Sequence, residues 1–271
     1  MNTQKLTLTI LGSGTSTGIP VIGCACPVCR SSDPRNRRTR CSALISWGPH
    51  RILLDTATDL RQQMLREKID RIDAVLYTHY HADHLHGIDD LRIFTLRSKA
   101  AIPLYGLAST LQSIRNNFGY IFDPAAEPGY IPLLKTFPVA ESFEVCGLPI
   151  VPVPLLHGPM EVFGYRIGPL AYLTDCNQIP RESLALLEGV EYLVIDGLRL
   201  TPHKTHFNLT QAVAMAQRIG ARQTWLTHLS HEVDHTRHEK ELPAGIALAY
   251  DGLRIEVELP GPRIAAGDSG R

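Results

Sequence analysis

The stretch Thr78-His79-Tyr80-His81-Ala82-Asp83-His84 holds three histidines and one aspartate within six positions. A short apolar run of strand type precedes it, and a segment with a helical pattern follows. Neutral imidazole and carboxylate groups are good ligands for zinc, manganese and iron. Four such groups at one strand end cannot all face a single ion, so we expect His79/His81 to face one metal and Asp83/His84 a second. The stretch therefore predicts a two-metal hydrolytic site, and the alternative is a histidine-rich polar surface loop.

The composition is that of an ordinary soluble globular protein, with 44% hydrophobic and 20% charged residues in a chain of 271. Lys plus Arg and Asp plus Glu each total 27, so the formal net charge is zero, which argues against the broad basic surface that nucleic-acid binding requires. No apolar run reaches the roughly 18 residues of a membrane span, and the N-terminus lacks the apolar core of a signal peptide. We expect a cytoplasmic protein with neither a membrane nor a nucleic-acid partner, one domain over residues 1–260, and a flexible tail over 261–271.

A second cluster of metal-binding residue types is Cys24-Ala25-Cys26-Pro27-Val28-Cys29. Three thiols so close together cannot all pair as disulfides among themselves, and a reducing compartment favours a metal over disulfides. The thiolates can supply three corners of a tetrahedral zinc site, with a fourth ligand from elsewhere in the chain. Such a closed site would be structural. Unrelated thiols or a redox cluster are the alternatives.

Several other strand-like segments end in a residue that can bind metal. An apolar run leads directly to Asp55 and His157, and through one threonine to Asp175 and His228. Each signal is weak by itself, because a lone histidine after a strand is usually not a ligand. Together with the histidine-rich stretch they suggest a shared rim of strand ends where a site is built.

The remaining segments give a mixed α and β pattern. Strand pairs are expected at 43–46/51–55, 143–145/150–156, 163–167/171–174 and 246–250/253–259, the last around the turn pair Asp251-Gly252. Helices are expected at 58–67, 109–117, 181–187 and 208–218. The glycine-rich segment 12–18 is either a turn or an anion-binding loop. The aromatic- and proline-rich segment 119–138 is the least regular, and is either a loop over the substrate or a packed connector.

The motif His79-x-His81-x-Asp83-His84, with the later strand-end residues, resembles the metallo-β-lactamase superfamily over roughly residues 5–259. The resemblance implies an α/β fold, the αβ/βα sandwich of two mixed sheets with helices on both outer faces and a dinuclear metal site at one sheet edge. It implies a first metal held by His79, His81 and His157, a second held by Asp83, His84 and His228, and Asp175 as the bridge between them.

Three further features resemble the phosphoribosyl cyclic phosphodiesterases of the carbon–phosphorus lyase pathway. These are the opening Leu11-Gly12-Ser13-Gly14-Thr15-Ser16 with Gly18-Ile19-Pro20, the cysteine cluster, and Thr227-His228-Leu229-Ser230-His231. The resemblance implies one structural zinc held by Cys24, Cys26, Cys29 and His231. It also implies that His206 acts near the scissile phosphate, whereas His203 does not match and is assigned to the surface. A homodimer is implied in the same way.

These implications predict a phosphodiesterase with two divalent metal ions, manganese or zinc. A hydroxide shared by both metals would attack a small cyclic or nucleotide-like phosphodiester. Asp83 would orient the attacking water, and His206 would bond the phosphate or protonate the departing oxygen. A tRNA 3′-processing ribonuclease and a thioester or lactone hydrolase on the same fold are alternatives. A metal-binding regulatory protein without catalysis is a third.

Overall fold

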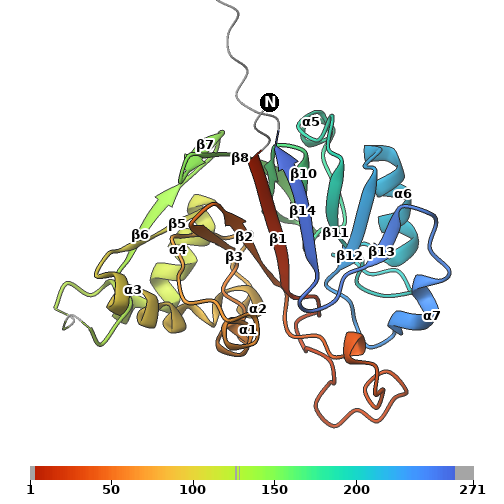
Figure 1. The fold of residues 1–271 in the computed structure, drawn as a ribbon, viewed down its shortest axis with the longest axis horizontal. Coiled ribbons are helices and arrows are strands. Elements are labelled where there is room, and N and C mark those ends of the chain that lie inside the picture. Colours follow the sequence, from red (N-terminus) through yellow and green to blue (C-terminus); the bar gives the residue numbers. More distant parts are fainter. Residues whose placement is uncertain (1–3, 126, 128, 260–271) are drawn as a thin grey trace, which may run out of the picture.

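The computed structural model describes residues 4–125, 127 and 129–259, so the predicted tail at 261–271 lies outside it. Fourteen strands form two sheets (Figure 1). The strands of the first sheet are β1 (Gln4–Gly12), β2 (Ser42–Trp47), β3 (His50–Leu54), β4 (Ala74–Leu76), β5 (Ile102–Gly106), β6 (Leu134–Pro138) and β14 (Arg254–Leu259). Those of the second are β7 (Phe143–Val145), β8 (Leu148–His157), β9 (Met160–Ile167), β10 (Leu170–Leu173), β11 (Tyr192–Asp196), β12 (Gln223–Thr227) and β13 (Ile246–Leu248).

Both sheets are mixed, and each has seven strands. The first has the order β14-β1-β2-β3-β4-β5-β6, and the second the order β13-β12-β11-β10-β9-β8-β7. Strands β3 to β6 run parallel to one another, as do β10 to β13. Parallel strands place their carboxyl ends at one edge of a sheet, where α/β proteins build their sites. This order explains why so many strand-end residues can meet.

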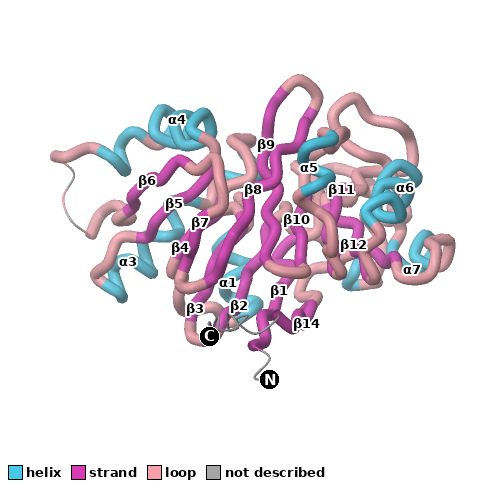
Figure 2. Tube along the Cα trace, turned by 90° about the horizontal axis from the view of Figure 1, so that it is seen from above, coloured by secondary structure: helices cyan, strands magenta, loops and turns pink. Residues whose placement is uncertain are grey.

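Helices cover both outer faces, as Figures 1 and 2 show. Beside the first sheet lie α1 (Leu60–Glu67), α2 (Ala82–Leu85), α3 (Arg92–Ser98) and α4 (Ala108–Asn117). Beside the second lie α5 (Arg181–Ala185), α6 (Leu209–Ile219) and α7 (His235–Glu239). Short 3-10 helices span Pro34–Asn36, Ile88–Leu91 and Gly119–Phe122. The predicted αβ/βα sandwich is confirmed. Within the described part of the chain, no helix has the length and apolar character to cross a bilayer.

Alternating apolar residues make the interior between the sheets. In β14, buried Ile255, Val257 and Leu259 alternate with exposed polar residues, and Leu6, Leu8 and Ile10 of β1 are buried in the same layer. The second sheet contributes larger side chains, including Phe163, Tyr165 and Tyr172. This central layer holds the two sheets in the register that brings their edges together.

The predicted hairpin at the end of the chain is wrong. Strand β13 lies parallel to β12 in the second sheet, while β14 pairs antiparallel with β1 in the first. The Asp251-Gly252 turn therefore carries the chain from one sheet to the other. Its carboxylate accepts hydrogen bonds from the backbone N–H groups of Ser13 (2.9 Å) and Thr39 (2.8 Å), which anchor the turn to the end of β1. Local turn chemistry was identified correctly, but the partner strands were not.

Parts of two other segments are more regular or more tightly packed than their composition indicates. Segment 119–138 ends in β6, which pairs with β5 at the edge of the first sheet, and begins with a 3-10 helix. The glycines of segment 12–18 serve close packing: a Cβ on Gly12 would lie 1.9 Å from the carbonyl oxygen of Arg40, and one on Gly14 would lie 2.9 Å from that of Arg38. This packing accounts for both glycines without a bound anion.

Candidate active site

The structure brings together all seven residues predicted to form the dinuclear site. One ligand atom from each of His79, His81, His157 and Asp175 lies within 4.8 Å of the others, and the same holds for Asp83, His84, Asp175 and His228. These are the two sets that the sequence resemblance implied, with Asp175 common to both. The residues come from the ends of β4, β8, β10 and β12 and from the first turns of α2.

The atoms that face one another are suited to cations. The Nε2 atoms of His79, His84 and His228 are buried and have no hydrogen-bond partner among the described residues. Asp175 Oδ1 lies 3.2 Å from His84 Nε2, and Asp175 Oδ2 lies 3.3 Å from His228 Nε2 and 3.8 Å from His79 Nε2. Two ligands about 2.1 Å from a shared cation are separated by roughly 3–3.5 Å. Buried lone pairs without donors, beside carboxylates, fit two divalent ions.

Hydrogen bonds behind the histidines fix which nitrogen faces the site. His84 Nδ1 lies 2.7 Å from Asp55 Oδ2, so Asp55 accepts the Nδ1–H and leaves Nε2 as the free lone pair. His79 Nδ1 lies 3.0 Å from the hydroxyl of Thr78, which in turn donates to Asp55 at 2.8 Å. One buried carboxylate therefore orients ligands predicted for both metals.

The third oriented ligand is His157. Its Nδ1 lies 2.7 Å from the carbonyl oxygen of Thr205, which can only accept, so the Nε2 lone pair of His157 is free. Burial lowers the pKa of His157 to about 4. Burial, followed by the nearby His84, holds the pKa of His79 well below its ordinary value. Both imidazoles are therefore neutral at pH 7, which is the form that binds metal.

Three residues of this rim have a strained backbone. Asp55, Asp175 and His228 adopt left-handed conformations, with φ values of 60°, 51° and 59°. Such conformations are uncommon for residues other than glycine and cost of order 1–3 kcal/mol each. Asp55 and His228 directly follow a strand and Asp175 lies two residues after one, so the left-handed turn directs each side chain toward the shared edge.

His206 lies beside the two metal-binding groups and is held by an acidic partner. Its Nδ1 lies 2.7 Å from Asp196 Oδ2, which also accepts the backbone N–H of Cys176 at 2.9 Å. The His206 ring is 4.5 Å from the ring of His157 and stacks at 4.8 Å on that of His228. The structure thus places His206 next to two of the predicted metal ligands. His203, assigned to the surface, is partly exposed, and its ring lies 5.1 Å from that of His206.

The cysteine cluster is completed by the predicted histidine. The Sγ atoms of Cys24, Cys26 and Cys29 lie 3.3, 3.7 and 3.6 Å from His231 Nδ1. A tetrahedral zinc with Zn–S of 2.3 Å and Zn–N near 2.0 Å separates sulfur from nitrogen by about 3.5 Å. These four side chains therefore fit a closed zinc site. His231 is only three positions from His228, so one short segment contributes to both centres.

Two important carboxylates have no role that the sequence alone predicts. For Asp55 the sequence indicates only a place at a strand end, and Asp196 is the last residue of β11. Both are fully buried, and each holds a histidine through its Nδ1–H. The available signal was the same for both: a carboxylate directly after an apolar strand whose carboxyl end lies at the shared edge.

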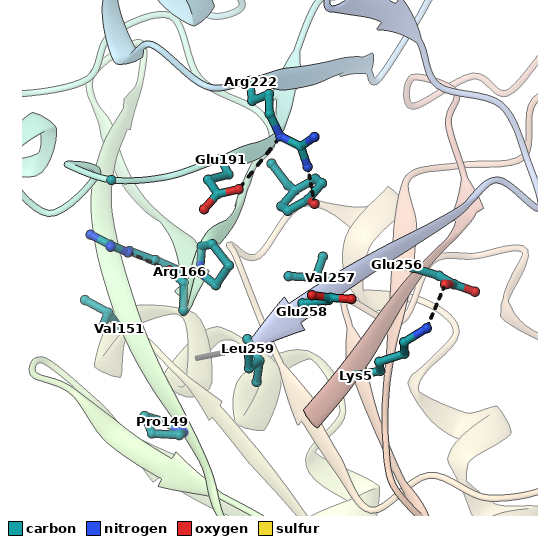
Figure 3. Close-up of a pocket in the computed structure, with 14 residues that line it drawn as sticks. Lys5, Pro149, Val151, Arg166, Glu191, Arg222, Glu256, Val257, Glu258 and Leu259 are labelled. Carbon is teal, nitrogen blue, oxygen red and sulfur yellow. Dashed lines mark hydrogen bonds and ion pairs between the residues drawn. The ribbon is translucent and has the colours of Figure 1, made fainter. Parts of the chain in front are cut away.

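A separate cavity of about 1000 Å³ lies far from these residues, at the opposite end of β1 and β14 (Figure 3). Its wall includes the exposed ion pairs Lys5–Glu256 and Arg222–Glu191, each 3.8 Å. Exposed pairs of this kind contribute little to binding or stability. None of the predicted site residues lines this cavity, so the clustered histidines remain the candidate active site.

Known proteins share this architecture. The model of the beta-lactamase superfamily domain matches residues 50–229. A crystal structure described as a new diphosphatase from the PhnP family is 44% identical, with a TM-score of 0.89, and the match covers 95% of this chain and 99% of that one. Zn²⁺-bound PqqB from Methylobacterium extorquens is 24% identical, with a TM-score of 0.76 over 93% of this chain and all of that one, which shows a shared fold.

A curated relative is the octanoyltransferase of Porphyromonas gingivalis, 42% identical over 260 residues. The match covers 94% of this chain but 52% of that protein, so the chain spans about half the length of this relative. The octanoyltransferase activity therefore describes the longer protein. Together, the family model and the full-length match to the diphosphatase establish that the chain belongs to the β-lactamase superfamily and, within it, to the PhnP family, whose fold implies a metal-dependent hydrolase.

Proposed function

We propose that this protein is a dinuclear metal-dependent phosphodiesterase that hydrolyses a small cyclic or nucleotide-like phosphodiester. The observation that supports this most directly is the pair of four-ligand groups that share Asp175, with the Asp196-held His206 beside them. The likeness to a PhnP-family diphosphatase also favours phosphorus as the reacting centre.

His79, His81, His157 and Asp175 would hold one metal ion, and Asp83, His84, His228 and Asp175 the other. Two divalent cations there supply Lewis acidity to phosphoryl oxygens and make water more acidic. We propose manganese or zinc, since histidine and carboxylate ligands suit both. The zinc bound by PqqB favours zinc. We further propose one structural zinc at Cys24, Cys26, Cys29 and His231.

The side chains of the chain itself perform the remaining tasks. Because His206 donates its Nδ1–H to Asp196, only its Nε2 can exchange a proton with substrate. From that position His206 bonds a phosphoryl oxygen or delivers a proton to the departing oxygen. Asp83, only 7% exposed, is a metal ligand that also orients the attacking water. The nearly complete burial of the cluster excludes bulk water and strengthens each of these interactions.

The test is turnover of purified protein, loaded with Mn²⁺ or Zn²⁺, on bis(4-nitrophenyl) phosphate, a thioester and precursor tRNA. We expect hydrolysis of the phosphodiester. His206→Ala should lower kcat by about 100- to 10,000-fold while the metal content stays unchanged. Loss of metal in this variant would make His206 structural. Thioesterase or tRNA cleavage without activity on the phosphodiester would refute the proposed function.

A further inference from the structure

The loop at residues 197–207, which contains His206, also contains Arg199, His203 and Lys204 but no aspartate or glutamate. It is fixed at several points. Leu198 N–H donates to the Phe207 carbonyl at 2.9 Å, and Asn177 donates to the Lys204 carbonyl at 3.0 Å. The loop is therefore a firmly held segment, rich in donors, at the side of the metal-binding groups.

The tautomer of His203 follows from its hydrogen bonds. The backbone N–H of Thr205 can only donate, and it points to His203 Nδ1 at 3.3 Å. Nδ1 must therefore be an unprotonated acceptor, and the proton of the neutral ring lies on Nε2. Burial, with His206 and Arg199 nearby, lowers the pKa of His203 below its ordinary value, which keeps the ring neutral at pH 7. His203 thus has a fixed Nε2–H donor.

His203 adjoins the histidine that lies beside the metal-binding groups. The ring centroid of His206 lies 4.8 Å from that of His228 and 5.1 Å from that of His203. His203 is partly exposed, whereas His206 and His228 are buried. A group bonded to His203 would therefore lie next to a group bonded to His206.

The charge around His203 favours an anion. The guanidinium of Arg199 donates to the carbonyl oxygens of Thr201 (3.2 Å) and Pro202 (2.8 Å). Across the described part of the chain, neither Arg199 nor Lys204 forms an ion pair with a carboxylate. Their positive charge is therefore not neutralised by a carboxylate of the described residues, and the Arg199 charge is near enough to act on His203.

We propose that His203 is a specificity residue that donates its Nε2–H to a second phosphoryl group, adjacent to the one that is attacked, so that the site favours substrates with a diphosphate bridge. This inference rests on the proposed phosphodiesterase function. The reaction is hydrolysis: a water oxygen bonds to one phosphorus, the bridging P–O bond breaks with its electron pair on the bridging oxygen, and two phosphomonoesters result. His206 serves the attacked phosphoryl group, and His203 serves its neighbour.

Steady-state kinetics on two substrates test the proposal. P1,P2-di(adenosine-5′) diphosphate has two adjacent phosphoryl groups, and bis(4-nitrophenyl) phosphate has one. His203→Ala should raise the KM for the diphosphate at least tenfold more than the KM for the monophosphate ester, because a hydrogen bond to a charged group is lost. His203→Gln, which keeps an N–H donor, should bring the KM for the diphosphate most of the way back to the wild-type value. The matched control is His50→Ala, which replaces a partly exposed histidine on β3. It should leave the KM for both substrates unchanged.

The outcomes separate this inference from the function on which it rests. Equal losses on both substrates in His203→Ala would mean that His203 merely holds the loop through Thr205, and would overturn the proposal. Wild-type protein that cleaves only the monophosphate ester would overturn the proposal and leave the phosphodiesterase function intact. Wild-type protein that cleaves neither substrate would overturn both.

Discussion

Replacement of Asp196 by asparagine tests whether this carboxylate acts through His206. Asp196 Oδ2 accepts hydrogen bonds from His206 Nδ1 at 2.7 Å and from Cys176 N at 2.9 Å, whereas Oδ1 has no partner among the described residues. The amide oxygen of asparagine can take the place of Oδ2 and accept both bonds. The substitution therefore preserves the contacts and removes the charge.

The expected cost follows from the kind of hydrogen bond. A bond to a charged group contributes about 1.5–3 kcal/mol and a neutral one about 0.5–1.5 kcal/mol, so roughly 1.4 kcal/mol is lost. This difference corresponds to about a tenfold lower kcat. Burial raises the pKa of Asp196, which means that its charge is costly to the fold. The amide NH2 that replaces Oδ1 is buried in turn, so we expect the two effects to offset each other and Asp196→Asn to change the melting temperature little.

The assay is a double-mutant cycle on bis(4-nitrophenyl) phosphate, with metal content measured for each variant. Asp196→Asn should lower kcat about tenfold in the wild-type background. In the His206→Ala background it should have little further effect, because the hydrogen bond through which it acts on the reaction is to that imidazole. A tenfold loss that persists without His206, or a loss of metal ions in Asp196→Asn alone, would refute this reasoning.

Three further predictions concern metal binding and stability. Asp55→Asn should weaken metal binding by about 10- to 100-fold, because His84 loses its charged acceptor. Titration of the variant with limiting metal measures the affinity, and an unchanged affinity would contradict this prediction. Cys29→Ser should release one zinc per chain while the other metal ions stay bound, measured by elemental analysis; retention of all the metal would disprove the structural site. Gly12→Ala should lower the free energy of unfolding by more than 2 kcal/mol, because its Cβ would lie 1.9 Å from a carbonyl oxygen. Gly119→Ala is the control and should be nearly neutral, because no atom lies within 4 Å of its Cβ. Urea titration of both variants measures the difference, and equal stabilities would contradict the prediction.

Much of the candidate site could be predicted because its residue types are chemically distinctive and partly local. His79, His81, Asp83 and His84 fall within one short stretch, and the three cysteines fall within another. Distant members such as Asp175 and His228 were weak signals individually. They gained meaning from their order along the chain and from the family resemblance. The structure then placed all of them in the expected groups.

The errors and omissions have a common origin in nonlocal pairing. The Asp251-Gly252 turn has the sequence of a hairpin turn. However, β13 before it pairs with β12 and β14 after it pairs with β1, in different sheets. Segment 134–138 combines strand-favouring Thr136 and Phe137 with Lys135 and Pro138, which strands disfavour, and it forms a strand by pairing with the edge of β5. Hydrogen bonding to a neighbouring strand decided both cases, and a local pattern contains no information about that neighbour.

By itself, the sequence determined the chemistry of this protein: which side chains can bind metal, which strands are amphipathic, and which residues stand at strand ends. The tertiary structure alone decided which strand ends meet. It brought Asp55 to His84 and Thr78, Asp196 to His206, and His231 to cysteines about two hundred positions away. The physical reason is that apolar periodicity fixes the face of each strand, whereas the order of strands is set by burial of the whole interior. The tautomers of His84, His157 and His203, on which the proposed chemistry depends, are consequences of that order.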